Sequence, residues 1–505
     1  MIGRKACLTL AALAAIAPIG VGAQTFEIDG VAFSESVYLE DDELQDIASD
    51  YTGRPISFND LQDLLDEIQA SYLQAGIVTA RPILPPQEIR DGVLKIELVE
   101  ATVSSIEVEG FDQTEDDFLT RTLQIEPGTE PDFESIEQDL RIFDIAHDIR
   151  PTLSFRPGPE PGTTIAVIRG EEPDRFQFTG SVDNFGSAET GEIRGSLFGR
   201  ISSVTGWRDT LNLQLQASSG AYSGSASYSR PIGGRGGRIL ASASYTNSRV
   251  IGGPFTAVDI LSNSAVGSLG YSQPFRVRPA SYGVAQINAL YEQSDSDLEG
   301  TSLSSQNLTE LVVNAAHVWQ GATSNASLSF GAKAGNADSQ EVSETEGFYY
   351  LLFGSGGYAR RIGEQLLVDA NLNFQYAEGQ NLPVSRLFTL GGATSVRGYP
   401  VNVRSGDSGA LLKLQVSRAI PYRSESQPKL TYNPLGFADL GVVVPFRDTG
   451  GFDAEQDVLA SIGGGVRIDF DGRARGLVML GVPLKNTLGF EADSVTAYVG
   501  IDYDF

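Results

Sequence analysis

Apolar and polar residues alternate with a period of two through most of the chain after residue 174. In 211–217 and again in 368–376, leucine, alanine, valine or aromatic residues alternate with Asn, Gln and Asp. Segments of about ten residues with this period are typical of membrane β-barrel strands, whose side chains face lipid and lumen in turn. About sixteen such segments can be counted, and bacterial barrels require an even number. The pattern therefore predicts an all-β, sixteen-stranded antiparallel transmembrane β-barrel over 174–505.

A different pattern precedes these strands. Apolar residues recur at helical spacing from Phe58 to Tyr72, and Ser57 can cap that helix, with Asp60 in its first turn. The order strand-helix-helix-strand-strand fits residues 24–100, and the same order repeats over 101–173. We therefore predict two α+β domains of β-α-α-β-β order in front of the barrel.

The first 23 residues have the features of an export signal. Arg4 and Lys5 form a positive start, Leu8 to Val21 is apolar but too short to span a bilayer, and Ala23 ends a small-residue cleavage site. We therefore predict a signal peptide over 1–23. The single cysteine, Cys7, lies inside it, so the mature chain is predicted to hold no disulfide and no thiolate metal site.

Charge divides the chain in the same place as the hydrophobic pattern. The whole sequence has a formal net charge of −29, and residues 24–174 hold 35 acidic but 9 basic residues, against 30 and 25 in 175–505. This imbalance argues against nucleic acid as a partner, because phosphate contacts need Lys and Arg. The acidic domains are either simply well solvated or help to attract a basic segment of a partner.

The residue inventory also argues against an enzyme. The two histidines, His147 and His317, lie far apart in different regions. The sequence contains no zinc-protease, nucleophile-elbow or phosphate-loop motif. We predict no catalytic residue, no cofactor and no metal site.

The longest connection between predicted strands, 378–407, holds the most informative residues. The tetrapeptide Val396-Arg397-Gly398-Tyr399 lies within it, behind the pair Gly391-Gly392. Long loops in compact domains are usually functional or disordered, and glycines allow tight backbone geometry. The sequence therefore predicts an ordered loop folded into the barrel rather than an external loop.

A candidate partner for Arg397 lies on a later strand. Phe437, Asp439 and Gly441 alternate there with apolar residues, so period two places these three toward the lumen. A charge inside a barrel is costly unless an opposite charge meets it. Asp439 is therefore predicted to pair with Arg397.

Two further sets of residues are candidates for special roles. The same alternation places Arg467 and Asp469 inside the barrel, where they either extend a polar network or are ordinary channel-lining charges. Tyr503 and Phe505 lie on one face of the last strand. That ending looks like the terminal signal that the barrel-assembly machinery reads.

These motifs resemble a known family. Val-Arg-Gly-Tyr with a downstream Phe-x-Asp-x-Gly is similar to the paired signature of outer-membrane barrels that transport polypeptides, and the N-terminal repeats resemble POTRA (polypeptide-transport-associated) domains. The stretch 84–94, Leu-Pro-Pro-Gln to Asp-Gly-Val-Leu, looks like the first POTRA domain of two-partner secretion transporters. The chain as a whole resembles the haemolysin and filamentous haemagglutinin secretion-activation family.

The resemblance implies an outer-membrane translocation pore of a Gram-negative bacterium. Periplasmic POTRA domains would recognise an unfolded exoprotein, a large β-helical adhesin or haemolysin, and the barrel would secrete it. Outer-membrane lipid and the barrel-assembly machinery are the other implied partners. Several family members carry an N-terminal plug helix; here the first POTRA strand begins close to the predicted cleavage site, so closure is expected to depend on the loop, the barrel or a POTRA domain. The alternatives are an assembly factor for other outer-membrane proteins and a passive solute porin.

Overall fold

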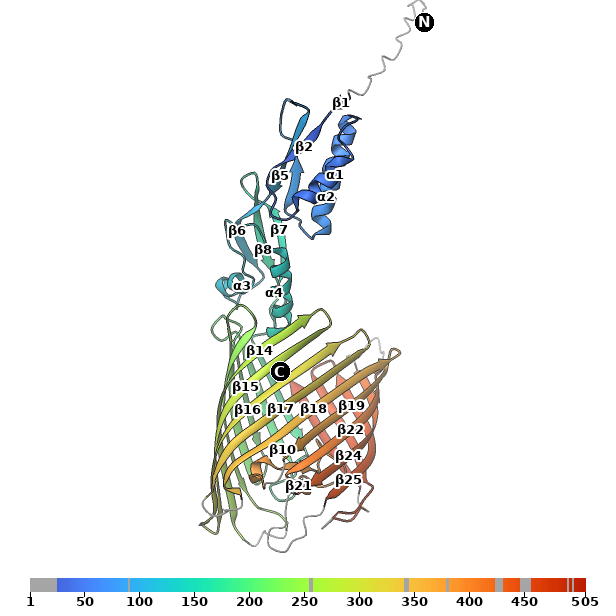
Figure 1. Ribbon diagram of the computed structural model, residues 1–505. Helices are drawn as coiled ribbons and strands as arrows, with labels where there is room; N and C mark the ends of the chain where they lie inside the picture. The colour runs from blue at the N-terminus through green and yellow to red at the C-terminus, as the bar shows by residue number, and fades with distance from the viewer. Residues whose placement is uncertain are drawn as a thin grey trace, which may run out of the picture. The chain divides into compact units, whose positions relative to one another are not determined.

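The computed structural model describes residues 25–505 except residue 90 and the segments 254–257, 340–344, 378–380, 423–429, 446–455, 488–489 and 493–494. The predicted signal peptide lies outside the described residues. The chain forms two compact units (Figure 1). The first extends to Ile106 and includes Pro127–Phe133 and Ser154–Ala166, and the second comprises Glu107–Glu126, Glu134–Leu153 and Val167–Phe505.

The first predicted domain has the expected β-α-α-β-β order, with two short strands added. Its elements are β1 (Phe26–Glu27), β2 (Gly30–Phe33), α1 (Asp41–Ser49), β3 (Pro55–Ile56), α2 (Phe58–Gln74), β4 (Ala80–Ile83) and β5 (Val93–Glu100). Strands β2, β5 and β4 form one sheet, in that order, whereas β1 pairs with β3. The first strand of the main sheet is therefore Gly30–Phe33, and Phe26–Glu27 belongs to the separate two-stranded sheet.

The core of this domain follows from the amphipathic pattern of α2. Leu64 and Ile68 are fully buried, and they belong to one apolar cluster with Leu94 and Ile96 of β5. The alternation along β5 and the helical period of α2 therefore place the apolar faces of these two elements against each other, as a two-layer α+β domain requires.

The second predicted domain repeats the same order. Its elements are β6 (Thr102–Glu109), α3 (Asp116–Thr122), α4 (Phe133–Ala146), β7 (Thr152–Pro157) and β8 (Thr163–Arg169). The sheet order is β6-β8-β7. The α+β fold predicted for the N-terminal region is thus confirmed.

The rest of the described chain forms a closed antiparallel β-barrel. Its strands are β9 (Phe176–Asp183), β10 (Arg194–Ser202), β11 (Thr210–Ala217), β12 (Ala221–Ile232), β13 (Gly237–Arg249), β14 (Ile260–Arg278), β15 (Ser281–Leu298), β16 (Thr301–Gln320), β17 (Ser324–Ser339), β18 (Gly347–Ile362), β19 (Leu366–Tyr376), β22 (Ser408–Arg418) with its continuation β23 (Ile420–Tyr422), β24 (Leu430–Val444), β25 (Asp457–Phe470), β26 (Ala474–Pro483) and β27 (Thr496–Asp504). With β22 and β23 as one strand, the described residues give sixteen, as predicted. The last strand, β27, pairs with the first, β9, and closes the barrel.

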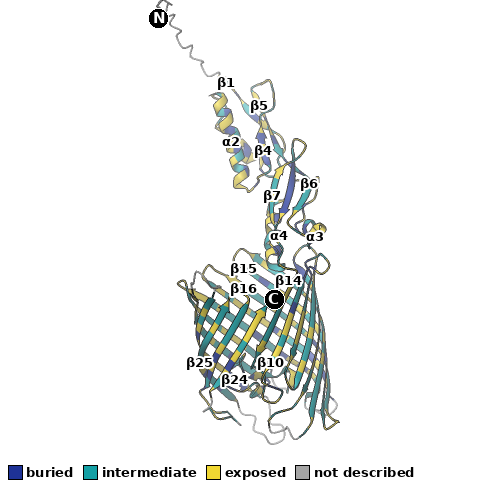
Figure 2. Ribbon diagram, turned by 180° about the vertical axis from the view of Figure 1, so that it is seen from behind, coloured by how far each residue is buried: buried dark blue, intermediate teal, exposed yellow. Residues whose placement is uncertain are grey.

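Exposure alternates along these strands. On β16, Leu311 and Val313 are about half exposed, whereas Leu308 and Glu310 are buried. Exposed residues, yellow in Figure 2, occur along many strands of the barrel. The apolar positions of the period-two pattern therefore face outward, where lipid would lie, and the polar positions face the interior.

The connection between β19 and β22 folds back against the interior of the barrel. It contains a 3-10 turn (Val384–Arg386) and two short strands, β20 (Phe388–Leu390) and β21 (Arg404–Gly406), which pair as a hairpin. Leu390 is fully buried in one cluster with Leu411, Val443 and Leu459 of the wall. These wall positions alternate with outward-facing ones, so the hairpin lies on the lumen side.

Candidate functional site

The tip of this interior loop depends on two glycines at which the backbone is left-handed. Gly391 has φ +111° and Gly398 has φ +100°. A Cβ atom at Gly391 would lie 2.1 Å from the carbonyl oxygen of Pro400, and one at Gly398 would lie 3.0 Å from the carbonyl carbon of Gly481. Neither position tolerates a side chain, so the loop can approach the wall this closely only with glycine there.

Arg397 and Asp439 form a buried, two-pronged ion pair. Arg397 Nε donates to Asp439 Oδ2 at 2.7 Å, and Nη2 donates to Oδ1 at 2.7 Å. The Arg397 backbone N–H also donates to Oδ2, at 3.1 Å. The two side chains are 5% and 0% exposed. A guanidinium and a carboxylate that meet in this fork geometry form one of the stronger protein hydrogen-bonded pairs.

The remaining face of the Arg397 guanidinium is also occupied. Its centre lies 3.6 Å from the centroid of the Phe437 ring, and Nη1 donates to Gln415 Oε1 at 2.9 Å. Ring stacking and a neutral acceptor satisfy the guanidinium without adding another charge. Phe437 and Asp439 therefore contact Arg397 together, from one strand, β24.

The two residues after Arg397 connect the tip to two further strands. The N–H of Gly398 donates to the Tyr498 hydroxyl of β27 at 2.8 Å, and Thr496 Oγ1 donates to the Gly398 carbonyl at 2.7 Å. The Tyr399 hydroxyl donates to the Ala460 carbonyl of β25 at 3.0 Å. These bonds hold the backbone of the tip, and the ion pair holds its side chain.

Gly441 belongs to the same site for a steric reason. A Cβ atom there would lie 2.7 Å from a methyl of Leu390 and 2.9 Å from one of Val396. Val396 itself is fully buried. The loop motif and the strand motif thus meet in the structure. At Gly392 an added Cβ atom would lie 3.1 Å from a methyl of Val401, and the Gly392 N–H donates to the Tyr399 carbonyl.

The structure does not bring the other two sets of predicted residues to this site. Asp469 Oδ1 accepts a hydrogen bond from Gly472 in the turn after β25, and Arg467 is exposed. At the chain end, the rings of Tyr503 and Phe505 lie 5.1 Å apart, and the Phe505 N–H donates to the carbonyl of Phe178 on β9. Within the described chain, none of these residues contacts Arg397 or Asp439.

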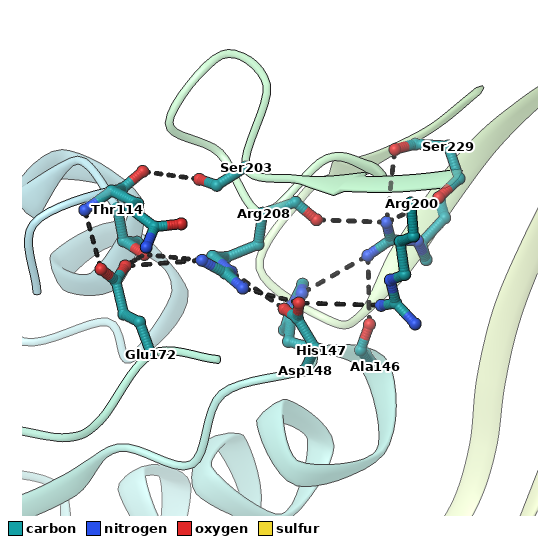
Figure 3. A network of polar contacts seen from close by, with 11 residues as sticks. Thr114, Ala146, His147, Asp148, Glu172, Arg200, Ser203, Arg208 and Ser229 are labelled. Atoms are coloured by element: carbon teal, nitrogen blue, oxygen red, sulfur yellow. Dashed lines mark hydrogen bonds and ion pairs between the residues drawn. The ribbon is translucent and has the colours of Figure 1, made fainter. Parts of the chain in front are cut away.

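Sequence reasoning missed a second buried arginine, Arg208, in the turn between β10 and β11 (Figure 3). Its side chain is 0% exposed. Nε donates to Asp148 Oδ1 at 2.9 Å after α4, and Nη1 lies 3.4 Å from Glu172 Oε1. Thr114 Oγ1, before α3, donates to the same Glu172 oxygen. No local motif marks these residues, which lie 36 to 94 positions from Arg208.

His147 lies beside this network and is held in its neutral form. Its ring packs against Phe118 and Phe143, at centroid distances of 5.1 Å and 4.5 Å. Burial, followed by the nearby Arg238 guanidinium, lowers the pKa of His147 to about 3. Arg238 in turn donates to the Ala146 carbonyl and to Ser229 Oγ. The end of α4 is thus bonded to strands β12 and β13.

The described residues contain no group of three or more His, Cys, Asp or Glu side chains placed to hold a metal ion. Among the same residues, we find no helix with both the length and the apolar character needed to cross a membrane.

Comparison with known families identifies two matches. The family model for the haemolysin secretion/activation protein ShlB/FhaC/HecB matches residues 162–468, and the ShlB-type POTRA domain model matches residues 26–101. The heme/hemopexin transporter protein HuxB of Haemophilus influenzae is 26% identical over 401 residues, covering 76% of this chain and 70% of its own. The hemolysin transporter protein ShlB of Serratia marcescens is 24% identical over 423 residues, covering 80% and 73%.

Solved structures show the same fold. CdiB from Escherichia coli matches with a TM-score of 0.72 at 18% identity, over 97% of this chain and 92% of that one. BamA from Haemophilus ducreyi, lacking POTRA domains 1–3, matches with a TM-score of 0.56 at 14% identity, over 95% and 99%.

Proposed function

The chain belongs to the haemolysin secretion/activation family, the outer-membrane transporters of two-partner secretion, and we propose how its parts carry an exoprotein across that membrane. The POTRA domains, in the periplasm, receive the unfolded exoprotein. The sixteen-stranded barrel conducts it. The interior loop, locked by Arg397 and Asp439, keeps the barrel competent for transport. The observation that supports this role of the loop is the Arg397–Asp439 pair, which is buried inside a closed barrel.

A barrel of this size needs an element inside it that controls passage through the lumen. Sixteen strands enclose a lumen wide enough for a water-filled channel. The loop holds a buried arginine, three glycines with positive φ and a tyrosine hydrogen-bonded to the wall. Residues in such conformations persist only where the surroundings over-determine them. A loop tip held this firmly acts as a fixed part of the pore.

Recognition of the exoprotein by the POTRA domains is proposed to use the sheet edges. In the sheet order β2-β5-β4, strands β2 and β4 are the outer strands, and in β6-β8-β7 these are β6 and β7. An extended peptide can add to such an edge through its backbone, whatever its sequence. The acidic composition of residues 24–174 would favour a peptide segment with excess Lys and Arg.

The secreted partner is proposed to be a large exported protein of β-helical type, an adhesin or a haemolysin. The named relatives include a hemolysin transporter and a heme/hemopexin transporter. Two further partners are proposed: outer-membrane lipid, which the exposed apolar side chains of the barrel wall would contact, and the barrel-assembly machinery during biogenesis.

Removal of residues 25–100 tests the proposed role of the first domain. This segment lies within the first compact unit, whereas helices α3 and α4 share the second unit with the barrel. We expect the truncated protein to insert into the outer membrane with an unchanged heat-shifted gel mobility, and the exoprotein encoded with it to stay in the periplasm. Secretion at the full-length level would exclude this domain as the receptor.

A strain that lacks the whole gene distinguishes the two alternatives. Loss of unrelated outer-membrane proteins in a full deletion of the gene would favour an assembly factor. Normal secretion of the exoprotein in that deletion, with lower uptake of small solutes, would favour a porin.

A further inference from the structure

A second arginine of the loop, Arg386, is buried against a different part of the barrel wall. Its Nε donates to Glu310 Oε2 of β16 at 2.7 Å, and its Nη1 donates to Glu292 Oε2 of β15 at 2.8 Å. The side chains of Arg386, Glu292 and Glu310 are 8%, 6% and 1% exposed. One guanidinium therefore bridges two carboxylates that come from neighbouring strands.

The surroundings of Glu292 and Glu310 make the Arg386 guanidinium necessary for the burial of both carboxylates. Tyr349 donates its hydroxyl to the same Glu310 oxygen at 2.8 Å, and Gln375 donates to the Arg386 carbonyl at 2.7 Å. An apolar cluster packs beside them and includes Leu308, Leu351 and Leu382. Two buried carboxylates in such a place would repel each other and lack water, and a planar guanidinium is the side chain that can bond both at once.

The two arginine contacts lie on separate parts of the barrel. The partners of Arg386 are on β15 and β16, whereas Asp439 is on β24. Strands β17, β18, β19 and β22 lie between them in the sheet order. The loop is therefore attached to the wall at two places, with residues 387–396 between the two attachments.

We propose that Arg386 is a second positioning residue of the loop, which holds its first arm against β15 and β16 and so fixes its course through the lumen. The attachment rests on geometry alone, while its consequence for secretion rests on the proposed function. When this contact is broken, the arm before Arg397 leaves the wall although the tip remains locked.

Arg386 is the weaker of the two attachments. It is held by side-chain bonds to two glutamates and by its carbonyl. The tip around Arg397 has in addition a bond from its own N–H to Asp439, the stacked Phe437 ring and the bonds of Gly398 and Tyr399. The arm at Arg386 is therefore the part of the loop that a transported chain would displace first.

The test uses a spin label at Val384→Cys, a position 78% exposed and two residues before Arg386, in a Cys7→Ser background that leaves no other cysteine. Purified full-length protein is compared with three variants: Arg386→Ala, the triple variant Arg386→Ala with Glu292→Gln and Glu310→Gln, and Arg249→Ala. The last is the control, because the Arg249–Asp259 pair is exposed at 60% and 50% and lies outside the loop.

We expect the label to become several-fold more mobile in both Arg386 variants and unchanged in the control. Arg386→Ala alone should also lower the temperature of the heat-induced gel shift, because it removes the guanidinium that bonds two buried carboxylates. The triple variant should recover that temperature, but its label should stay mobile. Single-channel conductance should rise in both. A label as ordered in the triple variant as in the parent protein would overturn the proposal.

These readouts need no exoprotein, so they separate this proposal from the proposed function. A mobile label with unimpaired secretion would support the attachment and contradict the role of the loop in transport. An ordered label with impaired secretion would contradict the attachment.

Discussion

The stability of the Arg397–Asp439 pair depends on what the loss of one partner leaves behind. The Asp439 side chain is 0% exposed. Without Arg397 it would be a buried, uncompensated charge, and breaking a buried pair in this way costs about 3–5 kcal/mol. The fork geometry and the stacking on Phe437 depend on a planar guanidinium, which at the same time donates to Gln415. A lysine provides the charge but none of this geometry.

We therefore predict that Arg397→Lys impairs secretion almost as much as Arg397→Ala, while both variants still insert into the outer membrane. Secretion of the exoprotein per folded transporter is the measurement. Arg249→Lys, at an exposed pair, is the control and should secrete normally. The double variant Arg397→Ala with Asp439→Ala should be little worse than either single variant, since both remove one contact. Losses that simply add would show that the two residues act separately.

The buried His147 makes the stability of the folded protein depend on pH. Its pKa is about 3 in the folded protein, against an ordinary value near 6.5. The unfolded chain therefore binds one more proton between these values, so the contribution of neutral His147 to stability is full above about pH 6.5 and is lost as pH falls toward 3. The slope is at most about 1.4 kcal/mol for each pH unit.

We predict that His147→Phe removes part of the acid sensitivity of the region around α4. Limited proteolysis of the full-length protein between neutral pH and about pH 4.5 measures it. The wild type should become more sensitive as pH falls, and the variant should change less. His317→Phe, on β16, is the matched control and should behave as the wild type does. Equal acid sensitivity in all three proteins would contradict the prediction.

At the residue scale, sequence reasoning located some buried charges and missed others for a physical reason. Asp439 could be placed inside the barrel because a strand alternates with period two, so its apolar neighbours define the outer face. Arg386 and Arg208 have no such reference. Their carboxylate partners lie 36 to 94 positions away, and only the strand order of the barrel and the docking of α4 bring them together.

At the scale of the element, the local rules worked best where one element contains the whole interaction. The helix α2 begins with a capping box, in which Ser57 Oγ accepts from the Asp60 N–H and Asp60 Oδ2 accepts from the Ser57 N–H. Both residues precede or lie within the first turn, so sequence alone identified them. Strand lengths were harder to predict: β16 spans the 20 residues Thr301–Gln320 rather than about ten, and its first residues are mostly polar and show no alternation.

The loop tip leads to a prediction about Gly398. This residue has a positive φ, and an added Cβ would lie 3.0 Å from the Gly481 backbone. We expect Gly398→Ala to displace the tip, at a cost of about 1–3 kcal/mol for the strained backbone alone, and to lower secretion. Gly300→Ala is the control, since Gly300 also has a positive φ, of +81°, but no atom within 4 Å of an added Cβ.

Secretion and folded-barrel content should be measured for both glycine variants. Reduced secretion by Gly398→Ala alone would assign the effect to the lost approach of loop and wall. Equal effects of the two substitutions would assign it to backbone strain in general and contradict the role proposed for the tip.

For the whole molecule, the number of strands followed from counting alternating segments, but the closure did not. Pairing of β9 with β27 joins residues more than 300 positions apart, from Gly180 to Tyr503. Nothing local in either strand specifies the other. Closure is instead a consequence of the edge problem: in a membrane, an open sheet would leave unpaired backbone groups in lipid. The two edge strands, β9 and β27, therefore pair with each other.

Phe505 stands at this closure, and its predicted role in assembly can be separated from stability. Its backbone N–H donates to Phe178 across the seam, but its side chain is 78% exposed. An exposed ring outside the sheet adds little to the stability of the folded barrel, whereas a signal read by the assembly machinery acts before folding is complete.

We predict that Phe505→Ala lowers the amount of barrel in the outer membrane several-fold, while the molecules that do assemble show an unchanged temperature for the heat-induced gel shift. Tyr222→Phe, at an exposed ring elsewhere in the wall, is the control for yield. Unchanged yield of Phe505→Ala would exclude an assembly signal at this residue, and a lowered shift temperature in the assembled fraction would mean that the ring stabilises the seam itself.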